Sequence, residues 1–192
     1  QTNVIHFAFI NNVKSLLFLG STCVYPRECP QPIKEKYLLT SQLEKTNESY
    51  AVAKISGLKM CESYNFQYST NFISIMPTNI YGIKDNFDLD TSHVLPAMIN
   101  NLYNAKKHKL EKIYCWGTGT PRREFLYVDD LAEASIFILE NVSIKDKILY
   151  DSENNFLGII NVGLGSDISI KELAKLISSL VDFEGEILWD ES

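Results

Sequence analysis

Three residues in the first third of the chain could act together on a carbonyl group. Tyr50 and Lys54 lie four residues apart in the segment ESYAVAK, so on a helix both side chains would project from one face. An ammonium close to a phenol favours the phenolate, and such a pair can exchange a proton as a general acid–base. Ser21 follows a short apolar run that ends in Gly20 and that predicts a strand. It would lie at the carboxyl end of this strand, and parallel sheets bind their ligands at the carboxyl ends of their strands. Its hydroxyl could hydrogen-bond the carbonyl oxygen that Tyr50 protonates.

The Tyr-x-x-x-Lys spacing is weak evidence by itself, because Tyr103 and Lys107 share it. No hydroxyl residue at the end of a strand precedes this second pair at a comparable distance. We therefore expect Tyr103 and Lys107 to lie on a helix surface and the first pair to carry the chemistry.

The elements that must position these residues alternate along the chain. Short apolar runs at 15–20, 71–76, 113–116, 158–163 and 187–189 predict strands, the second of them ended by Pro77. Helical periodicity predicts helices over 3–12, 48–68, 92–109, 128–141 and 169–181. Thr46, Asn47 and Glu48 offer capping residues for the second helix. This alternation indicates an α/β fold with a mainly parallel sheet.

Composition limits the functional classes that fit the chain. A net charge of −6 over 192 residues argues against nucleic-acid binding. Four cysteines form no zinc-ligand spacing, and scattered free thiols favour a reducing, cytoplasmic compartment. The sequence has neither a leader-like segment nor a long apolar run, so it predicts no membrane span, and we expect no metal site.

Longer segments resemble the extended short-chain dehydrogenase/reductases. The resemblance is carried by FLGSTCVYP (18–26), TNESYAVAKISGLKMCESYN (46–65), MPTNIYGIKDNF (76–87), SHVLPAMI (92–99), WGTGTPRREFLYVDDLA (116–132) and INVGLG (160–165). They are similar to members that epimerise GDP-4-keto-6-deoxy-D-mannose at C3 and C5 and reduce C4 with NADPH. The resemblance implies a Rossmann-like parallel sheet with a smaller C-terminal substrate-binding lobe.

The resemblance also implies roles for five residues. Ser21, Tyr50 and Lys54 would serve the reduction, and Lys54 would hold the nicotinamide ribose of NADPH. Cys23 would act as base and His93 as acid in the epimerisations. An enolate formed at a carbon next to the carbonyl can be stabilised by donors around its oxygen, so one oxygen site would support both reactions.

Further positions match residues that bind ligands in the family. Pro77, Thr78, Asn79 and Ile80 would contact NADP(H), together with the three residues Tyr50, Lys54 and His93. Trp116, Arg123 and Asn101 would contact the GDP-sugar. The family often has a basic residue where this chain has Asn101, so that phosphate contact would be weaker or supplied by Arg122 or Lys106.

The resemblance divides the chain and suggests an assembly. Residues 1–90 would be the C-terminal part of the NADP-binding domain. Residues 91–192 would be mainly the GDP-sugar lobe, with segments returning to the first domain near 124–165. No glycine-rich dinucleotide fingerprint is present, because Gly163-x-Gly165 comes too late, so we expect a fragment that binds NADPH poorly alone. The helix over 48–68 and its neighbour would form a four-helix homodimer interface.

Other interpretations fit the same residues. A 4-epimerase or 4,6-dehydratase with tightly held NAD would share the triad but lack the Cys23–His93 couple. A catalytically silent binding protein of the same fold is a third possibility. Individually, Cys23 could be a buried small hydrophobe, His93 a capping or surface residue, and Trp116 part of the core.

Overall fold

The computed structural model describes residues 1–89 and 91–191, which form two compact units. Unit 1 comprises Gln1–Thr78 and Asp129–Gly163. Unit 2 comprises Asn79–Val128 and the segment from Leu164 onward. The assignment of an NADP-binding domain and a GDP-sugar lobe to parts of the chain stays a prediction.

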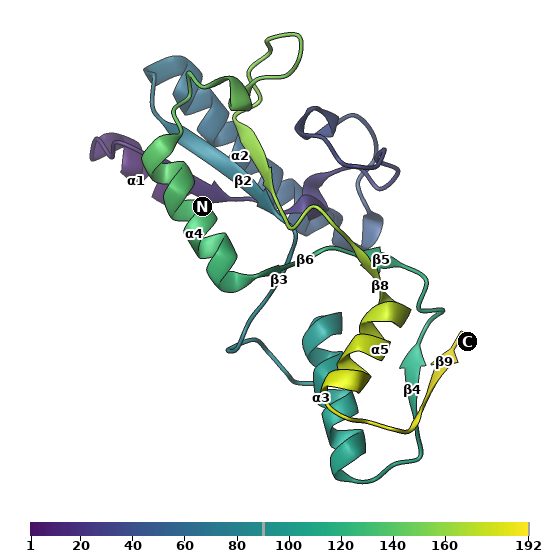
Figure 1. Cartoon of the computed structure of the whole chain (residues 1–192). Helices are drawn as coiled ribbons and strands as arrows, with labels where there is room; N and C mark the ends of the chain where they lie inside the picture. The colour runs from purple at the N-terminus through teal and green to yellow at the C-terminus, as the bar shows by residue number, and fades with distance from the viewer. Residues whose placement is uncertain (90, 192) are drawn as a thin grey trace. The chain divides into compact units, whose positions relative to one another are not determined.

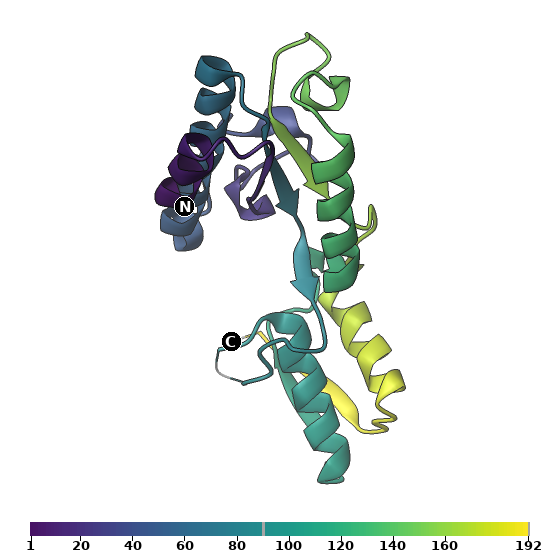
Figure 2. The same ribbon diagram turned by 90° about the vertical axis from the view of Figure 1, so that its left-hand side faces the viewer.

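Unit 1 is a parallel sheet between two layers of helices (Figure 2). The sheet has the order β1 (Leu16–Leu19), β2 (Phe72–Pro77) and β7 (Ile159–Val162). On one face lie α1 (Thr2–Ile10) and α2 (Glu48–Tyr68), and on the other lies α4 (Val128–Asn141). The predicted α/β class with a parallel sheet is therefore confirmed.

The central strand β2 explains this layering. All its residues are buried, and alternate side chains point to opposite faces. Phe72 packs with Ile5 of α1 and Cys61 of α2, whereas Ile73 and Ile75 pack with Ile138 of α4. A strand buried on both faces must be apolar at nearly every position, as this one is.

The prediction that Pro77 ends the second strand is wrong by one residue. Pro77 belongs to β2 and pairs with Val162 of β7. Gly20 donates its N–H to Ile75 O at 2.8 Å, which is the last hydrogen bond from the β1 side. Because β1 has ended there, the missing N–H of Pro77 removes no bond from the sheet.

The helix predicted over 48–68 is α2, with those bounds, but its start differs in detail. Asn47 is the N-cap, and its side chain makes no capping hydrogen bond. A short 3-10 turn, Lys45–Asn47, leads into α2, and the Glu44 carboxylate accepts a bond from Thr46 N at 3.4 Å. Inside α2, Ile55 and Leu58 are buried in the core of unit 1.

Unit 2 has its own core between two helices and a parallel strand pair (Figure 1). The helices are α3 (Val94–Lys107) and α5 (Ile170–Leu180), and the strands are β4 (Lys112–Trp116) and β9 (Glu186–Asp190). Leu102 and Ala105 of α3 pack with Leu173 and Ile177 of α5. A capping box between Ser169 and Glu172 starts α5.

Four short strands were not predicted from the sequence. β3 (Asn79–Tyr81) pairs in parallel with β6 (Phe125–Tyr127), and β5 (Arg122–Arg123) pairs antiparallel with β8 (Ile168–Ser169). Two or three residues are too few for a periodic pattern, so partners distant in sequence define these strands. Within the described residues, no helix is long and apolar enough to cross a membrane.

Candidate active site

The Tyr50–Lys54 pair lies in the first two turns of α2, beside the end of β1. The Lys54 Nζ atom donates a hydrogen bond to Leu19 O at 2.8 Å. It lies 5.5 Å from the centre of the Phe18 ring and 5.7 Å from that of Tyr50. Tyr50 is an exposed residue. An ammonium held at the carboxyl end of β1 leaves two of its three donors for other partners.

Ser21 and Cys23 form the turn that leaves β1. The Ser21 Oγ atom accepts a hydrogen bond from Cys23 N at 3.2 Å, and a 3-10 turn, Thr22–Val24, follows. Val24 is fully buried, whereas Cys23 is exposed. The alternative that Cys23 is a buried small hydrophobe is therefore wrong.

Gly20 lets this turn pass close to the sheet. A Cβ atom on Gly20 would lie 2.9 Å from Ile75 O and 2.5 Å from Met76 Sδ. A larger residue would push the turn off the sheet, and with it Ser21 and Cys23.

At the end of β2, one hydroxyl has an unused hydrogen-bonding capacity. Thr78 donates its backbone N–H to Val162 O at 3.1 Å, but its buried Oγ1 atom has no hydrogen-bond partner among the described residues. A buried hydroxyl without a partner costs free energy, so a bound polar group would compensate for it. Pro77 beside it is buried in β2.

The remaining predicted cofactor residues, Asn79 and Ile80, lie on β3 in unit 2. The Asn79 side-chain amide donates to Glu124 O at 2.9 Å, which holds β3 next to β6. The described contacts thus give Asn79 a structural partner inside its own unit.

On α3, the structure corrects the expected position of His93. The helix begins at Val94, so His93 is its N-cap and not part of its first turn. Its side chain is exposed and makes no capping hydrogen bond, so the imidazole does not stabilise this helix end. Asn101 lies further along α3 and is half-buried.

Trp116 and Arg123 are both exposed in unit 2. Trp116 ends β4 with 86% of its surface accessible, so the alternative that it belongs to the core is wrong. The Arg123 guanidinium donates to Arg122 O at 2.8 Å, and no ion pair to it occurs within the described residues. An exposed ring and an unpaired guanidinium are suited to bind a base and a phosphate.

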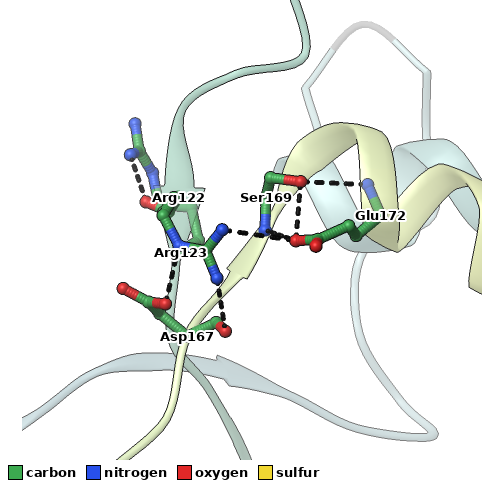
Figure 3. A network of polar contacts seen from close by, with 5 residues as sticks. All are labelled: Arg122, Arg123, Asp167, Ser169 and Glu172. Carbon is green, nitrogen blue, oxygen red and sulfur yellow. Dashed lines mark hydrogen bonds and ion pairs between the residues drawn. The ribbon is translucent and has the colours of Figure 1, made fainter.

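Arg122, by contrast, is fully engaged (Figure 3). Its Nε lies 2.7 Å from Asp167 Oδ1, and its Nη1 lies 3.3 Å from Glu172 Oε2. Hydrogen bonding to Asp167 raises the pKa of Arg122. The backbone and hydroxyl bonds from Ser169 lower the pKa of Glu172, so both charges persist at neutral pH.

Lys106 is engaged as well, through an ion pair with Asp182 at 3.0 Å. Arg122 and Lys106 were the two cations expected to compensate for the neutral Asn101. Because each already has a carboxylate partner, Arg123 is the better candidate for an anionic ligand in unit 2.

The predicted site residues fall in both units. Unit 1 holds Ser21, Cys23, Tyr50, Lys54, Pro77 and Thr78; unit 2 holds Asn79, Ile80, His93, Asn101, Trp116 and Arg123. Within unit 1, the Lys54–Leu19 hydrogen bond brings α2 to the strand end that precedes Ser21. The described residues contain no group of three or more His, Cys, Asp and Glu that could hold a metal ion.

Two features of the site were not predicted. The Lys54–Leu19 contact has no sequence signal, since its acceptor is a backbone carbonyl. The Arg122–Glu172 pair did have a sequence signal, because Ser169-x-x-Glu172 is a capping-box pattern that fixes a carboxylate at the start of α5.

Known proteins resemble this chain over nearly its full length. It is 50% identical over 190 residues to GDP-L-fucose synthase 1 of Arabidopsis thaliana, covering 99% of this chain and 55% of that protein. It is 46% identical over 192 residues to GDP-L-fucose synthase of Escherichia coli, covering 100% of this chain and 59% of that protein. The chain therefore spans about half the length of the curated relatives it matches.

A solved structure agrees with the fold. MlghC, GDP-mannoheptose C4 reductase from Campylobacter jejuni with NADP bound, superposes with a TM-score of 0.89 at 38% identity, covering 98% of this chain and 63% of that one. Residues 1–163 match the sequence pattern of the NAD dependent epimerase/dehydratase family. With its parallel sheet and its Tyr50–Lys54 pair at the end of β1, this chain belongs to the NAD dependent epimerase/dehydratase family.

Proposed function

We propose that this chain is part of a GDP-L-fucose synthase, which epimerises GDP-4-keto-6-deoxy-D-mannose at C3 and C5 and reduces C4 with NADPH. The observation that carries the proposal is the Lys54–Leu19 hydrogen bond, because it fixes the Tyr50–Lys54 helix at the strand end that leads into Ser21 and Cys23. The names of the relatives supply the substrate.

In the reduction, Tyr50 gives its phenolic proton to the oxygen on C4 of the sugar. The Lys54 ammonium favours the phenolate that remains, and the Ser21 hydroxyl donates a hydrogen bond to the same oxygen. The proton moves as the C4 carbonyl becomes an alcohol, so these residues act as acid and orienting donor. Their side chains must stay within hydrogen-bonding reach of one oxygen atom.

In the epimerisations, the Cys23 thiolate removes the proton from C3 or C5. Both carbons are next to the C4 carbonyl, so the resulting negative charge is shared with its oxygen. Ser21 and Tyr50 stabilise that oxygen with the hydrogen bonds that also serve the reduction. His93 returns a proton to the opposite face of the carbon, a role that rests on the resemblance of SHVLPA alone.

Two residues of unit 1 fit a bound NADP(H). Lys54 is already oriented by Leu19 O and has donors left for a ribose hydroxyl. Thr78 offers a buried Oγ1 atom without a partner among the described residues, as expected for a group that binds a carboxamide. When bound, NADPH supplies the hydride for C4; Lys54, Thr78 and Pro77 would hold and orient it.

For the GDP-sugar we propose Arg123 and Trp116 as the main contacts. Arg123 has the fork geometry that binds a phosphate with two hydrogen bonds, and its guanidinium carries no ion pair within the described part of the chain. The exposed Trp116 ring can cover a base or sugar. Asn101 would add a neutral hydrogen bond.

We further propose a cytoplasmic homodimer. Its support is the exposed apolar surface on α1, where Val4, Phe7 and Ile10 are each at least half accessible, beside α2 in the same layer. Two copies of α1 and α2 would bury these side chains in a four-helix interface. Four free cysteines favour a reducing compartment.

The experiment that tests the function is product analysis by NMR. The full-length polypeptide containing this chain is incubated with GDP-4-keto-6-deoxy-D-mannose and NADPH, and GDP-L-fucose is the expected product. Reduction without inversion at C3 and C5 would instead favour a C4 reductase of another GDP-sugar, the activity that the name of the MlghC structure describes. Absence of both reactions would favour a binding protein.

A further inference from the structure

Asn161, at the end of β7, holds the loop that follows Cys23. The Tyr25 hydroxyl donates to Asn161 Oδ1 at 2.6 Å, and Asn161 Nδ2 donates to Ile33 O at 3.1 Å. The Asn161 backbone N–H donates to Glu35 Oε1 at 2.9 Å. One residue thus fixes three points of a loop that contains no strand and no α-helix.

Tyr25, which anchors the loop to Asn161, is buried, whereas the nearby Cys23 is exposed. Val24 and Tyr25 are at most 4% exposed, and they come directly after the exposed Cys23. Burial raises the pKa of Tyr25, and the negative charge of Glu35 raises it further. The phenol therefore stays protonated and keeps donating to Asn161 throughout the neutral range.

Asn161 is itself held by the centre of the sheet. It lies opposite Met76 in the register of β2 and β7, and Met76 is fully buried. Tyr25 and Met76 pack in one apolar cluster with Ile55 and Leu58 of α2. The loop is therefore attached to the buried centre of unit 1.

We propose that Asn161 and Tyr25 are positioning residues for Cys23, an inference that rests on the function proposed above. The Cys23 backbone is held on one side by the Ser21 hydroxyl, at 3.2 Å, and on the other by the buried residues after it. The residues of the reduction depend on separate contacts: Tyr50 and Lys54 on the bond from Lys54 to Leu19, and Ser21 on the bond from the preceding Gly20 N–H to Ile75 O. Loss of the Asn161 anchor should therefore affect proton removal by Cys23 more than the reduction.

The test compares the two half-reactions in the full-length polypeptide. Epimerisation is measured as deuterium uptake at C3 and C5 of the 4-keto sugar in D2O, and reduction as NADPH oxidation with the epimerised 4-keto intermediate. Tyr25→Phe should lower the deuterium uptake about tenfold, since small misplacements of a catalytic group cost this much or more. Its NADPH oxidation should change less than about twofold.

Tyr37→Phe is the matched control. Tyr37 packs against the same apolar cluster, and no hydrogen bond of its hydroxyl occurs among the described residues, so both rates should stay at the wild-type level. Equal losses in the two half-reactions of Tyr25→Phe would overturn the proposal, as would an unchanged deuterium uptake. If Tyr25→Phe does not fold, Asn161→Leu is judged by the same criterion, because it removes the acceptor for Tyr25 and the donor to Ile33 in a side chain of similar size.

A measurement without substrate separates this inference from the proposed function. Backbone amide exchange, followed by mass spectrometry, should be faster over residues 21–26 in Tyr25→Phe and unchanged over α2. Unchanged amide exchange at residues 21–26 would overturn the proposal that Tyr25 and Asn161 hold this segment. If the wild type catalyses neither half-reaction, the proposed function fails, and amide exchange still decides whether the anchor exists.

Discussion

Gly57 on α2 permits the close packing that brings Lys54 to the end of β1. A Cβ atom at this position would lie closest to Cζ of Phe18 and 2.8 Å from its Cε2, closer than real contacts allow. Phe18 lies on β1, and its ring is 5.5 Å from Lys54 Nζ. Gly57→Ala must therefore move either the Phe18 ring or the helix that carries Lys54.

Two effects of opposite sign set the magnitude. Alanine in place of glycine inside a helix stabilises it by about 1 kcal/mol, whereas an extra methyl group in a packed core costs about 1–3 kcal/mol. The net expectation is a loss of about 1 kcal/mol in the free energy of unfolding. Displacing Lys54 from Leu19 O should also slow NADPH oxidation by roughly tenfold.

The assay is urea unfolding of the full-length polypeptide, with NADPH oxidation measured on the same preparation. Ser56→Ala is the control, because Ser56 is exposed on the same helix and gains helix propensity without a new contact; it should stabilise by about 0.5 kcal/mol. The reasoning would be refuted if Gly57→Ala were more stable than the wild type by about 1 kcal/mol and oxidised NADPH at the normal rate.

Three further predictions concern other parts of the chain. Arg123→Gln should raise KM for the GDP-sugar at least about tenfold, because the guanidinium that would bind the phosphate is lost. Arg122→Gln should raise KM only about twofold, and added salt should remove this smaller effect. Equal effects of the two substitutions on KM would contradict the assignment of Arg123. Burial raises the pKa of Cys61 to about 11 from 9.0. As the pH rises, the Cys61 thiol ionises in the unfolded chain before it ionises in the folded one. The contribution of Cys61 to the free energy of unfolding is therefore fully present below pH 9 and falls by up to about 2–3 kcal/mol towards pH 11. Cys61→Ala should lack this part of the pH dependence in unfolding titrations; an identical dependence would refute it. If the proposed dimer forms through α1, Phe7→Glu should convert it to a monomer in light scattering, while Ile83→Glu, on an exposed loop of unit 2, should not. A dimer that persists in Phe7→Glu would contradict this interface.

Much of the fold could be predicted because its signals are local. The apolar run of β2 and the long helix α2 were expected at nearly their observed bounds, and the alternation of strands and helices predicts that the strands of the main sheet run parallel. The order β1, β2 and β7 was not predicted, because β4 lies between β2 and β7 in the chain but pairs with β9. The strands β3, β5, β6 and β8 could not be predicted, because each is two or three residues long and depends on a partner far away in sequence.

The candidate site shows the same division. Residue type and spacing predict roles for Ser21, Tyr50 and Lys54, and the resemblance of the surrounding segments predicts one for Cys23; these roles stay predictions. Contacts to backbone atoms were not predicted, because Lys54 binds a carbonyl and Asn161 uses its own N–H. Such contacts depend on where the chain passes, which spacing alone does not encode.

In the proposed function, Cys23 moves protons while Tyr50 serves the reduction at the same carbonyl. The most direct test measures deuterium uptake at C3 and C5, and reduction of the epimerised intermediate, for Cys23→Ser and Tyr50→Phe in the full-length polypeptide. Cys23→Ser should abolish most of the uptake and retain the reduction, and Tyr50→Phe should lose the reduction while slowing uptake much less. Equal loss of both reactions in Cys23→Ser, or near-normal NADPH oxidation in Tyr50→Phe, would contradict the account.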